Sequence, residues 1–133
     1  MACVPDPMKS LGISPELLAT RRFQFLEQAD RSIVRPIKCG VIYVMAFWSG
    51  PARVAFEALK KSLAEVDPAG QIELVAIDTD GCPDFYLMPE FPRGLGGWGE
   101  SAWVRDGSIV DVAYGVQDYE TKIRNLLNEQ GNL

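Results

Sequence analysis

The segment Val41-Ile-Tyr-Val-Met-Ala-Phe-Trp-Ser-Gly-Pro-Ala-Arg53 predicts a buried strand that turns directly into a helix. Residues 41–47 are apolar without alternation, which is typical of a strand covered on both faces of its sheet. Proline is favoured in the first turn of a helix, and after Pro51 the period becomes helical. The apolar residues that then share one side are Ala55, Leu59, Leu63 and Val66. This order of elements is the beginning of an α/β fold.

A second strand and a hairpin continue the pattern. Residues 72–77 form another apolar run, and a strand, helix and strand joined by a short return predict a right-handed parallel βαβ unit. Asp106-Gly107 separates two β-rich runs, Ala102–Arg105 and Ser108–Tyr114, which is a strong hairpin signal. The other elements that we expect here are a short helix from near Pro83, an irregular loop over residues 89–99 and a final helix over residues 118–129.

The first part of the chain is expected to hold one helix. Ser14-Pro15-Glu16 is typical of a helix start, because serine caps free amides and proline fits the first turn. The residues that then share one helical face, as far as residue 31, are Leu18, Phe25 and Ala29. We therefore interpret residues 1–33 as an N-terminal extension with one helix and residues 34–133 as the α/β domain.

The composition excludes several classes of protein. The 133 residues are 47% hydrophobic and 23% charged, which is ordinary for a globular domain. No apolar run approaches the roughly 20 residues of a membrane helix, and the N-terminus lacks a secretory signal. We therefore expect a cytoplasmic protein with no membrane partner. The net charge of −5 argues against nucleic-acid binding, which draws its affinity from phosphate neutralisation.

The chemistry-bearing residues are few. The chain has no histidine, which excludes Ser-His and Cys-His catalysis and His-ligated metals. Cys3, Cys39 and Cys82 are scattered and odd in number, so they predict neither a zinc cluster nor a disulfide framework. The glycine-rich residues 94–99 lack the lysine and the strand-to-helix context of a phosphate loop. We therefore expect no metal and no cofactor.

Trp48-Ser49-Gly50-Pro51-Ala52-Arg53 resembles the thioredoxin active-site run Trp-Cys-Gly-Pro-Cys-Lys, position for position. It also lies where that family places the run, between a buried strand and a long helix. The resemblance covers roughly residues 34–130, including the hairpin and the final helix. It implies a thioredoxin-like three-layer α/β/α sandwich with a mixed four- to five-stranded sheet, here with an added N-terminal helix.

The chain departs from that family at each position that carries its chemistry. Ser49 stands at the nucleophile position and Ala52 at the resolving position. Tyr43 stands where the family carries a buried aspartate, and Gly99 where it carries a cis-proline. Dithiol–disulfide exchange requires a thiolate and a second thiol, and a hydroxyl forms no disulfide. The resemblance therefore implies a redox-inactive member, which is not an oxidoreductase of the usual kind.

The expected function is that of a non-catalytic module that binds a protein or peptide. The residues that we expect at its binding edge are Trp48, Ser49, Gly50, Pro51, Ala52, Cys82, Trp98 and Gly99. Ser49 is expected to cap the helix, whereas Trp48 and Trp98 have two open roles, packing and partner contact. Two alternatives stay open: a single-cysteine thiol protein that works through Cys82, and an assembly role through the basic N-terminal helix.

Overall fold

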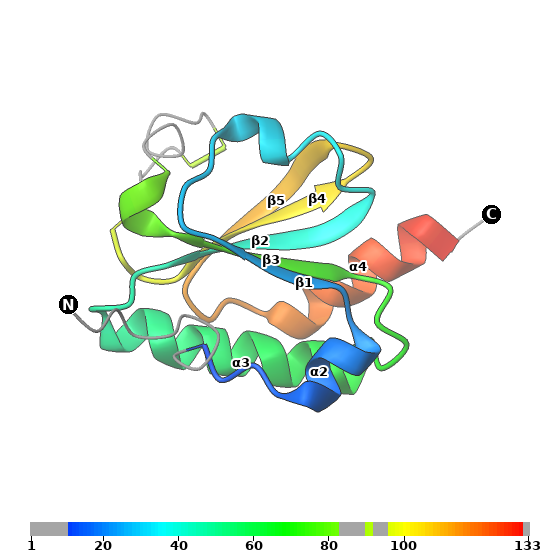
Figure 1. The fold of residues 1–133 in the computed structure, drawn as a ribbon. Helices are drawn as coiled ribbons and strands as arrows, with labels where there is room; N and C mark the ends of the chain where they lie inside the picture. The colour runs from blue at the N-terminus through cyan, green and yellow to red at the C-terminus, as the bar shows by residue number, and fades with distance from the viewer. Residues whose placement is uncertain (1–10, 83–89, 92–95, 132–133) are drawn as a thin grey trace.

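The centre of the fold is the uninterrupted apolar strand β2, Cys39–Met45, in which every residue is buried. The computed structural model describes residues 11–82, 90–91 and 96–131 of the chain, with the side chains of 129–131 left aside. The other described helices and strands are α2 (Pro15–Thr20), β1 (Phe23–Leu26), α3 (Gly50–Val66), β3 (Glu73–Asp78), β4 (Glu100–Arg105), β5 (Ser108–Tyr114) and α4 (Tyr119–Gly131), with short 3-10 turns η1 (Arg31–Ile33) and η2 (Thr79–Gly81) (Figure 1).

The strands form one mixed sheet in the order β1-β3-β2-β4-β5. β1 and β2 both pair with β3 in parallel, and Val41 lies opposite Leu74. β4 is antiparallel to both β2 and β5, and Val41 lies opposite Trp103 on this side. The predicted βαβ unit, the hairpin at Asp106-Gly107 and the α/β fold class are therefore confirmed.

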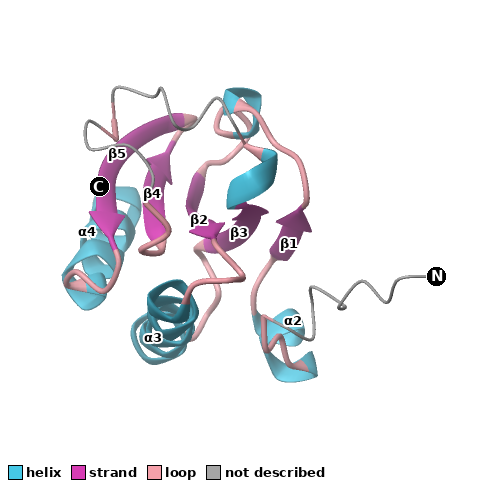
Figure 2. Ribbon diagram, turned by 90° about the vertical axis from the view of Figure 1, so that its left-hand side faces the viewer, coloured by secondary structure: helices cyan, strands magenta, loops and turns pink. Residues whose placement is uncertain are grey.

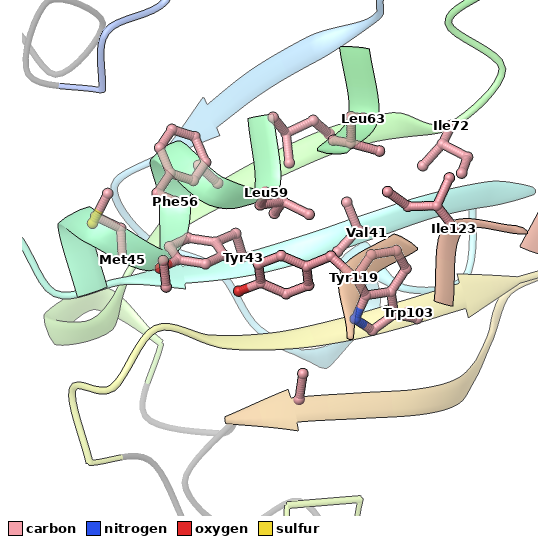
Figure 3. Packing of buried hydrophobic residues seen from close by; sticks show 14 of the residues in the cluster. Val41, Tyr43, Met45, Phe56, Leu59, Leu63, Ile72, Trp103, Tyr119 and Ile123 are labelled. Carbon is pink, nitrogen blue, oxygen red and sulfur yellow. The ribbon is translucent and has the colours of Figure 1, made fainter. Parts of the chain in front are cut away.

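Alternate residues of β2 supply two hydrophobic cores. Val41, Tyr43 and Met45 face the helices, where they pack with Phe56 and Leu59 of α3. Figure 3 shows this core, to which Trp103 of β4 and Tyr119 and Ile123 of α4 also contribute. On the opposite face, the buried cluster is formed by Val34, Ile37, Ile42, Val44, Val75, Ile77, Cys82, Phe91, Ala102 and Val104. A strand that serves two cores has no polar face, which explains the absence of alternation in residues 41–47.

The helices α2, α3 and α4 lie on one side of the sheet, and the 3-10 turns η1 and η2 lie on the other (Figure 2). The residues that cover this second face include Val34 and Ile37, from the connection between β1 and β2. The short helix that we expected from Pro83 falls on residues 83–88, outside the described part of the chain.

The expected N-terminal helix is present, but its predicted extent to residue 31 is wrong. α2 ends at Thr20, and Phe23–Leu26 forms the edge strand β1. Phe23 and Phe25 alternate with the exposed Gln24 and pack against the core on the helical side, which is the pattern of a half-buried strand. The sheet therefore includes residues that we had placed in the N-terminal extension.

A buried ion pair fixes this N-terminal segment to the end of α3. Nη1 of Arg21 lies 2.6 Å from Oδ2 of Asp67, and both side chains are almost fully buried. The guanidinium also donates to the carbonyls of Leu63, Asp67 and Ile72 at 2.7–3.0 Å. Asp67 accepts the backbone N–H groups of Gln71 and Ile72 in turn. Arg21 thus connects α2, α3 and the start of β3 through one side chain.

Candidate binding edge

The candidate site begins at the N-terminus of α3, where Ser49 is the N-cap. Its backbone is extended, and its hydroxyl oxygen accepts the N–H of Ala52 at 3.3 Å. The same hydroxyl donates to the carbonyl of Gly97 at 2.6 Å, and only 7% of the residue is exposed. Ser49 therefore caps the helix, as expected, and also holds a segment 48 residues further along the chain.

That segment, residues 96–99, is called the glycine turn below. Gly97 and Gly99 are buried and have φ angles of +77° and +87°, a region that side-chain-bearing residues rarely adopt. A Cβ atom on Gly97 would lie 2.5 Å from Cη2 of Trp48, and one on Gly99 would collide with the hydroxyl of Tyr43. Glycine is thus required at both positions, because aromatic side chains lie directly against the backbone.

Tyr43 takes a structural role in place of the aspartate of the family pattern. Its hydroxyl donates to the carbonyl of Ala52 in the first turn of α3, and its ring is fully buried against Phe56. Burial raises the pKa of this hydroxyl, with smaller contributions from Tyr119 and Glu100. The phenol therefore stays neutral and connects β2 to α3.

Gly99, at the place of the family's cis-proline, is part of an ordinary trans backbone. The carbonyl of Gly99 accepts the N–H of Gly115 at 3.1 Å, which joins the turn to the end of β5. Within residues 11–82, 90–91 and 96–131, no peptide bond is cis.

Glu100 is a buried carboxylate at the site that our sequence reasoning missed. It is the first residue of β4 and has no exposed surface. Oε2 accepts the N–H of Gly96 at 2.9 Å and, more weakly, that of Trp98 at 3.4 Å. Oε1 is buried and has no hydrogen-bond partner in the described part of the chain. The sequence signal that could have indicated this buried glutamate is its place directly after Gly99 and two residues before the apolar run Ala102–Val104.

Two exposed indoles lie at the glycine turn, one packed against it and one within it. Trp48 is 66% exposed and lies against Gly97, while Trp98 is 58% exposed and follows Gly97 in sequence. The structure thus brings together seven of the predicted edge residues: Trp48, Ser49, Gly50, Pro51, Ala52, Trp98 and Gly99. We call the surface made by Trp48, Ser49, Gly97 and Trp98 the binding edge. Large exposed aromatic side chains of this kind are enriched among residues that dominate binding energy.

Cys82 packs elsewhere. It is fully buried in the cluster on the face of the sheet opposite α3, and its Sγ lies 3.6 Å from the carbonyl of Thr79. Burial, with smaller contributions from the carboxylates of Asp78, Asp80 and Glu100, raises the pKa of this thiol to about 12. Cys39 is also buried, and burial raises the pKa of its thiol to about 11. Neither thiol is ionised at neutral pH, and the thiolate is the reactive form. Cys3 lies outside the described residues.

Metal and membrane chemistry find no support in the described residues. In that part of the chain, no group of three histidine, cysteine, aspartate or glutamate side chains could hold a metal ion. Among the same residues, no helix combines the length and the apolar character needed to cross a membrane.

Comparison of the sequence with protein families and with curated proteins finds no match in either. Solved structures of thioredoxins, by contrast, are similar in fold. Reduced desulfothioredoxin from Desulfovibrio vulgaris Hildenborough superimposes with a TM-score of 0.57 at 14% identity, over 79% of this chain and 96% of that chain. A mutant thioredoxin from Halobacterium salinarum NRC-1 gives 0.57 at 16% identity, over 90% and 96%. Thioredoxin from Trypanosoma brucei brucei gives 0.56 at 18%, over 77% and 92%. Together with the mixed sheet described above, this similarity shows that the chain has the thioredoxin fold.

Proposed function

We propose that this chain is a non-catalytic thioredoxin-like protein that binds a protein or peptide segment at the binding edge. The observation that carries the proposal is that the Ser49 side chain forms two structural hydrogen bonds. Its hydroxyl both accepts from Ala52 and donates to Gly97, so the residue at the nucleophile position is a structural link. Catalytic serine requires an adjacent base, and the chain has no histidine to supply one.

The exposed indoles support binding as the remaining role of this surface. Most large apolar side chains in the described part of the chain are buried, yet Trp48, against the glycine turn, and Trp98, within it, expose more than half of their surface. Ser49 and Glu100 form hydrogen bonds to the backbone of that turn, which favours one arrangement of the indoles. A preorganised aromatic surface loses little entropy when a partner binds.

The alternative function, single-cysteine chemistry through Cys82, has less support. A reactive cysteine needs an exposed thiol with a lowered pKa. The thiol of Cys82 is buried and its pKa is raised.

Selection from a phage-displayed library of random dodecapeptides tests the binding proposal. We expect peptides that bind the wild-type protein and lose affinity for the Trp48→Ala/Trp98→Ala double variant. A Val110→Ala variant is the matched control, because Val110 is an exposed apolar residue of β5, outside the binding edge. If no selected peptide distinguishes the double variant from the wild type, binding at this edge is refuted.

A further inference from the structure

We infer that the binding edge selects a partner segment that presents an arginine or lysine side chain, and that Glu100 provides the charge for this selection. The inference rests on the proposed function and specifies the chemistry of the partner. It follows from the position of one buried carboxylate beneath a backbone turn that carries one exposed indole and packs against a second.

The first step concerns the unused capacity of Glu100. A carboxylate can accept about four hydrogen bonds, and this one accepts two, both at Oε2. Oε1 is buried without a hydrogen-bond partner among the described residues. A buried acceptor with unused hydrogen-bonding capacity lowers the stability of a fold, so its presence calls for an explanation such as an interaction with a binding partner. Among the described residues, Glu100 accepts two backbone N–H groups and forms no ion pair with a basic side chain.

The second step concerns what lies between Glu100 and the surface. Oε2 bonds the amides on both sides of Gly97, so the carboxylate lies directly beneath the turn. The ring of Trp48 lies against Gly97 and the indole of Trp98 against Gly96, so a partner above the turn would contact these rings and not the carboxylate itself. Charges that are shielded from water are screened less by salt than exposed ones. A cation placed on the turn would therefore be attracted by Glu100 even without direct contact.

The third step concerns the indoles. Trp48 covers Gly97 and Trp98 lies against Gly96, and both indoles are more than half exposed, so a group placed over the turn meets an indole ring. The ring quadrupole attracts cations, most strongly for tryptophan, and a guanidinium stacks well on such a ring. The two indoles and the carboxylate thus all favour a positively charged side chain of the partner. An acidic partner side chain would be repelled by Glu100.

The described residues near the binding edge carry charges of both signs. Asp78, the last residue of β3, and Asp80, in η2, raise the pKa of the Cys82 thiol together with Glu100. Among the described residues, Arg53 in the first turn of α3 places a cation at this end, and its guanidinium bonds weakly to the carbonyl of Phe47 at 3.4 Å. Arg53 is exposed, so water screens its charge more than that of the buried Glu100.

Peptides from the library described above provide the test. We expect arginine or lysine to be enriched at one fixed position in the selected peptides. Replacing that arginine by citrulline, which has nearly the same shape but no charge, should weaken binding to the wild type about tenfold, which equals about 1.4 kcal/mol. With Glu100→Gln, which keeps an acceptor oxygen for the turn, the loss should fall to about twofold or less.

Glu65→Gln is the matched control. It removes the same charge from an exposed position of α3, roughly 20 Å along the helix from Gly50. This variant should keep the tenfold difference. The proposal is overturned, and peptide binding as such retained, if selected peptides carry no basic residue or if Glu100→Gln leaves the tenfold difference intact. Absence of any peptide that depends on Trp48 and Trp98 overturns the proposed function itself.

A second measurement covers the case in which Glu100→Gln does not fold, as judged by near-ultraviolet circular dichroism. On the wild type, the ratio of affinities for the arginine and citrulline peptides should fall as salt is added, because screening weakens charge–charge attraction. A ratio near one at low salt refutes selection by charge.

Discussion

Replacing Ser49 by alanine tests whether this residue is a structural link. Loss of the N-cap hydroxyl costs about 1 kcal/mol. The carbonyl of the buried Gly97 also loses its donor at 2.6 Å, and an unsatisfied buried acceptor costs about 1–3 kcal/mol. We therefore expect Ser49→Ala to lower the free energy of unfolding by about 2–4 kcal/mol.

The chain supplies a matched control in Ser14. This serine is also an N-cap: it accepts the N–H of Leu17 at 3.2 Å, at the start of the six-residue helix α2. Ser14→Ala removes a cap without breaking any second hydrogen bond that the structure assigns to its side chain, so we expect a loss of about 1 kcal/mol or less.

Urea denaturation of both variants measures the difference. A shift of the midpoint with an unchanged slope reports a change in stability alone. If Ser49→Ala lowers the free energy of unfolding by no more than Ser14→Ala does, the hydrogen bond from Ser49 to Gly97 contributes nothing to stability. The argument that Ser49 holds the glycine turn would then be refuted.

Three further predictions concern the ion pair, the glycine turn and the buried thiol. Arg21→Met should destabilise the fold by about 3–5 kcal/mol in urea, because it leaves Asp67 as a buried unpaired charge. Arg22→Met, at a neighbouring side chain that is 84% exposed, should change stability by less than about 0.5 kcal/mol, and equal effects would contradict the structural role of Arg21. Gly99→Ala should cost at least about 1–2 kcal/mol from its positive φ alone. Any further loss of stability in Gly99→Ala would come from the new Cβ meeting the Tyr43 hydroxyl, so adding Tyr43→Phe should recover part of it. If the two substitutions change the free energy of unfolding additively in a double-mutant cycle, that contact is excluded. The Cys82 thiol has its pKa raised by burial from 9.0 to about 12, so the folded state keeps its proton while the unfolded state loses it. The protonated thiol therefore stabilises the fold fully below pH 9, and this stabilisation disappears as the pH rises toward 12. Because Cys82→Ala lacks the thiol, its free energy of unfolding should fall less steeply between pH 9 and 12 than that of the wild type. Equal slopes of the free energy against pH would contradict the raised pKa.

Local signals explain why much of the fold could be predicted from the sequence. β2 and α3 follow from the apolar run 41–47, the Ser-Gly-Pro turn and the helical spacing after it. The hairpin follows from Asp106-Gly107, where both residues have positive φ. Each of these elements is determined by neighbours in the chain, so composition and spacing are sufficient.

β1 was missed because its formation depends on residues far away in the sequence. The spacing of Phe25 and Ala29 fits a helix as well as a strand, so periodicity alone does not decide. Pairing with β3, some 50 residues further along, and the bonds of Arg21 to Asp67 and Ile72 favour the extended form. Neither interaction has a local sequence signal.

The site was predicted in part for the same reason. The motif located Trp48, Ser49 and the start of α3, and the structure brings Trp98 and Gly99 to the same place. Glu100 was missed because its role depends on the path of the glycine turn, which directs two amides onto its carboxylate. In the sequence, a glutamate next to a glycine is equally compatible with a buried carboxylate that binds a turn and with an exposed residue at the end of a strand.

The departures from the thioredoxin pattern form one interdependent set in this structure. The Tyr43 hydroxyl fits only because Gly99 has no Cβ, and it bonds the carbonyl of Ala52. Ser49 bonds the carbonyl of Gly97, whose own missing Cβ leaves room for Trp48. A proline at Gly99 could not adopt its positive φ, and an aspartate at Tyr43 would leave the carbonyl of Ala52 without its donor. These mutual hydrogen bonds and contacts join the strand, the helix start and the glycine turn, and they support the proposal that the edge presents a preorganised surface to a partner.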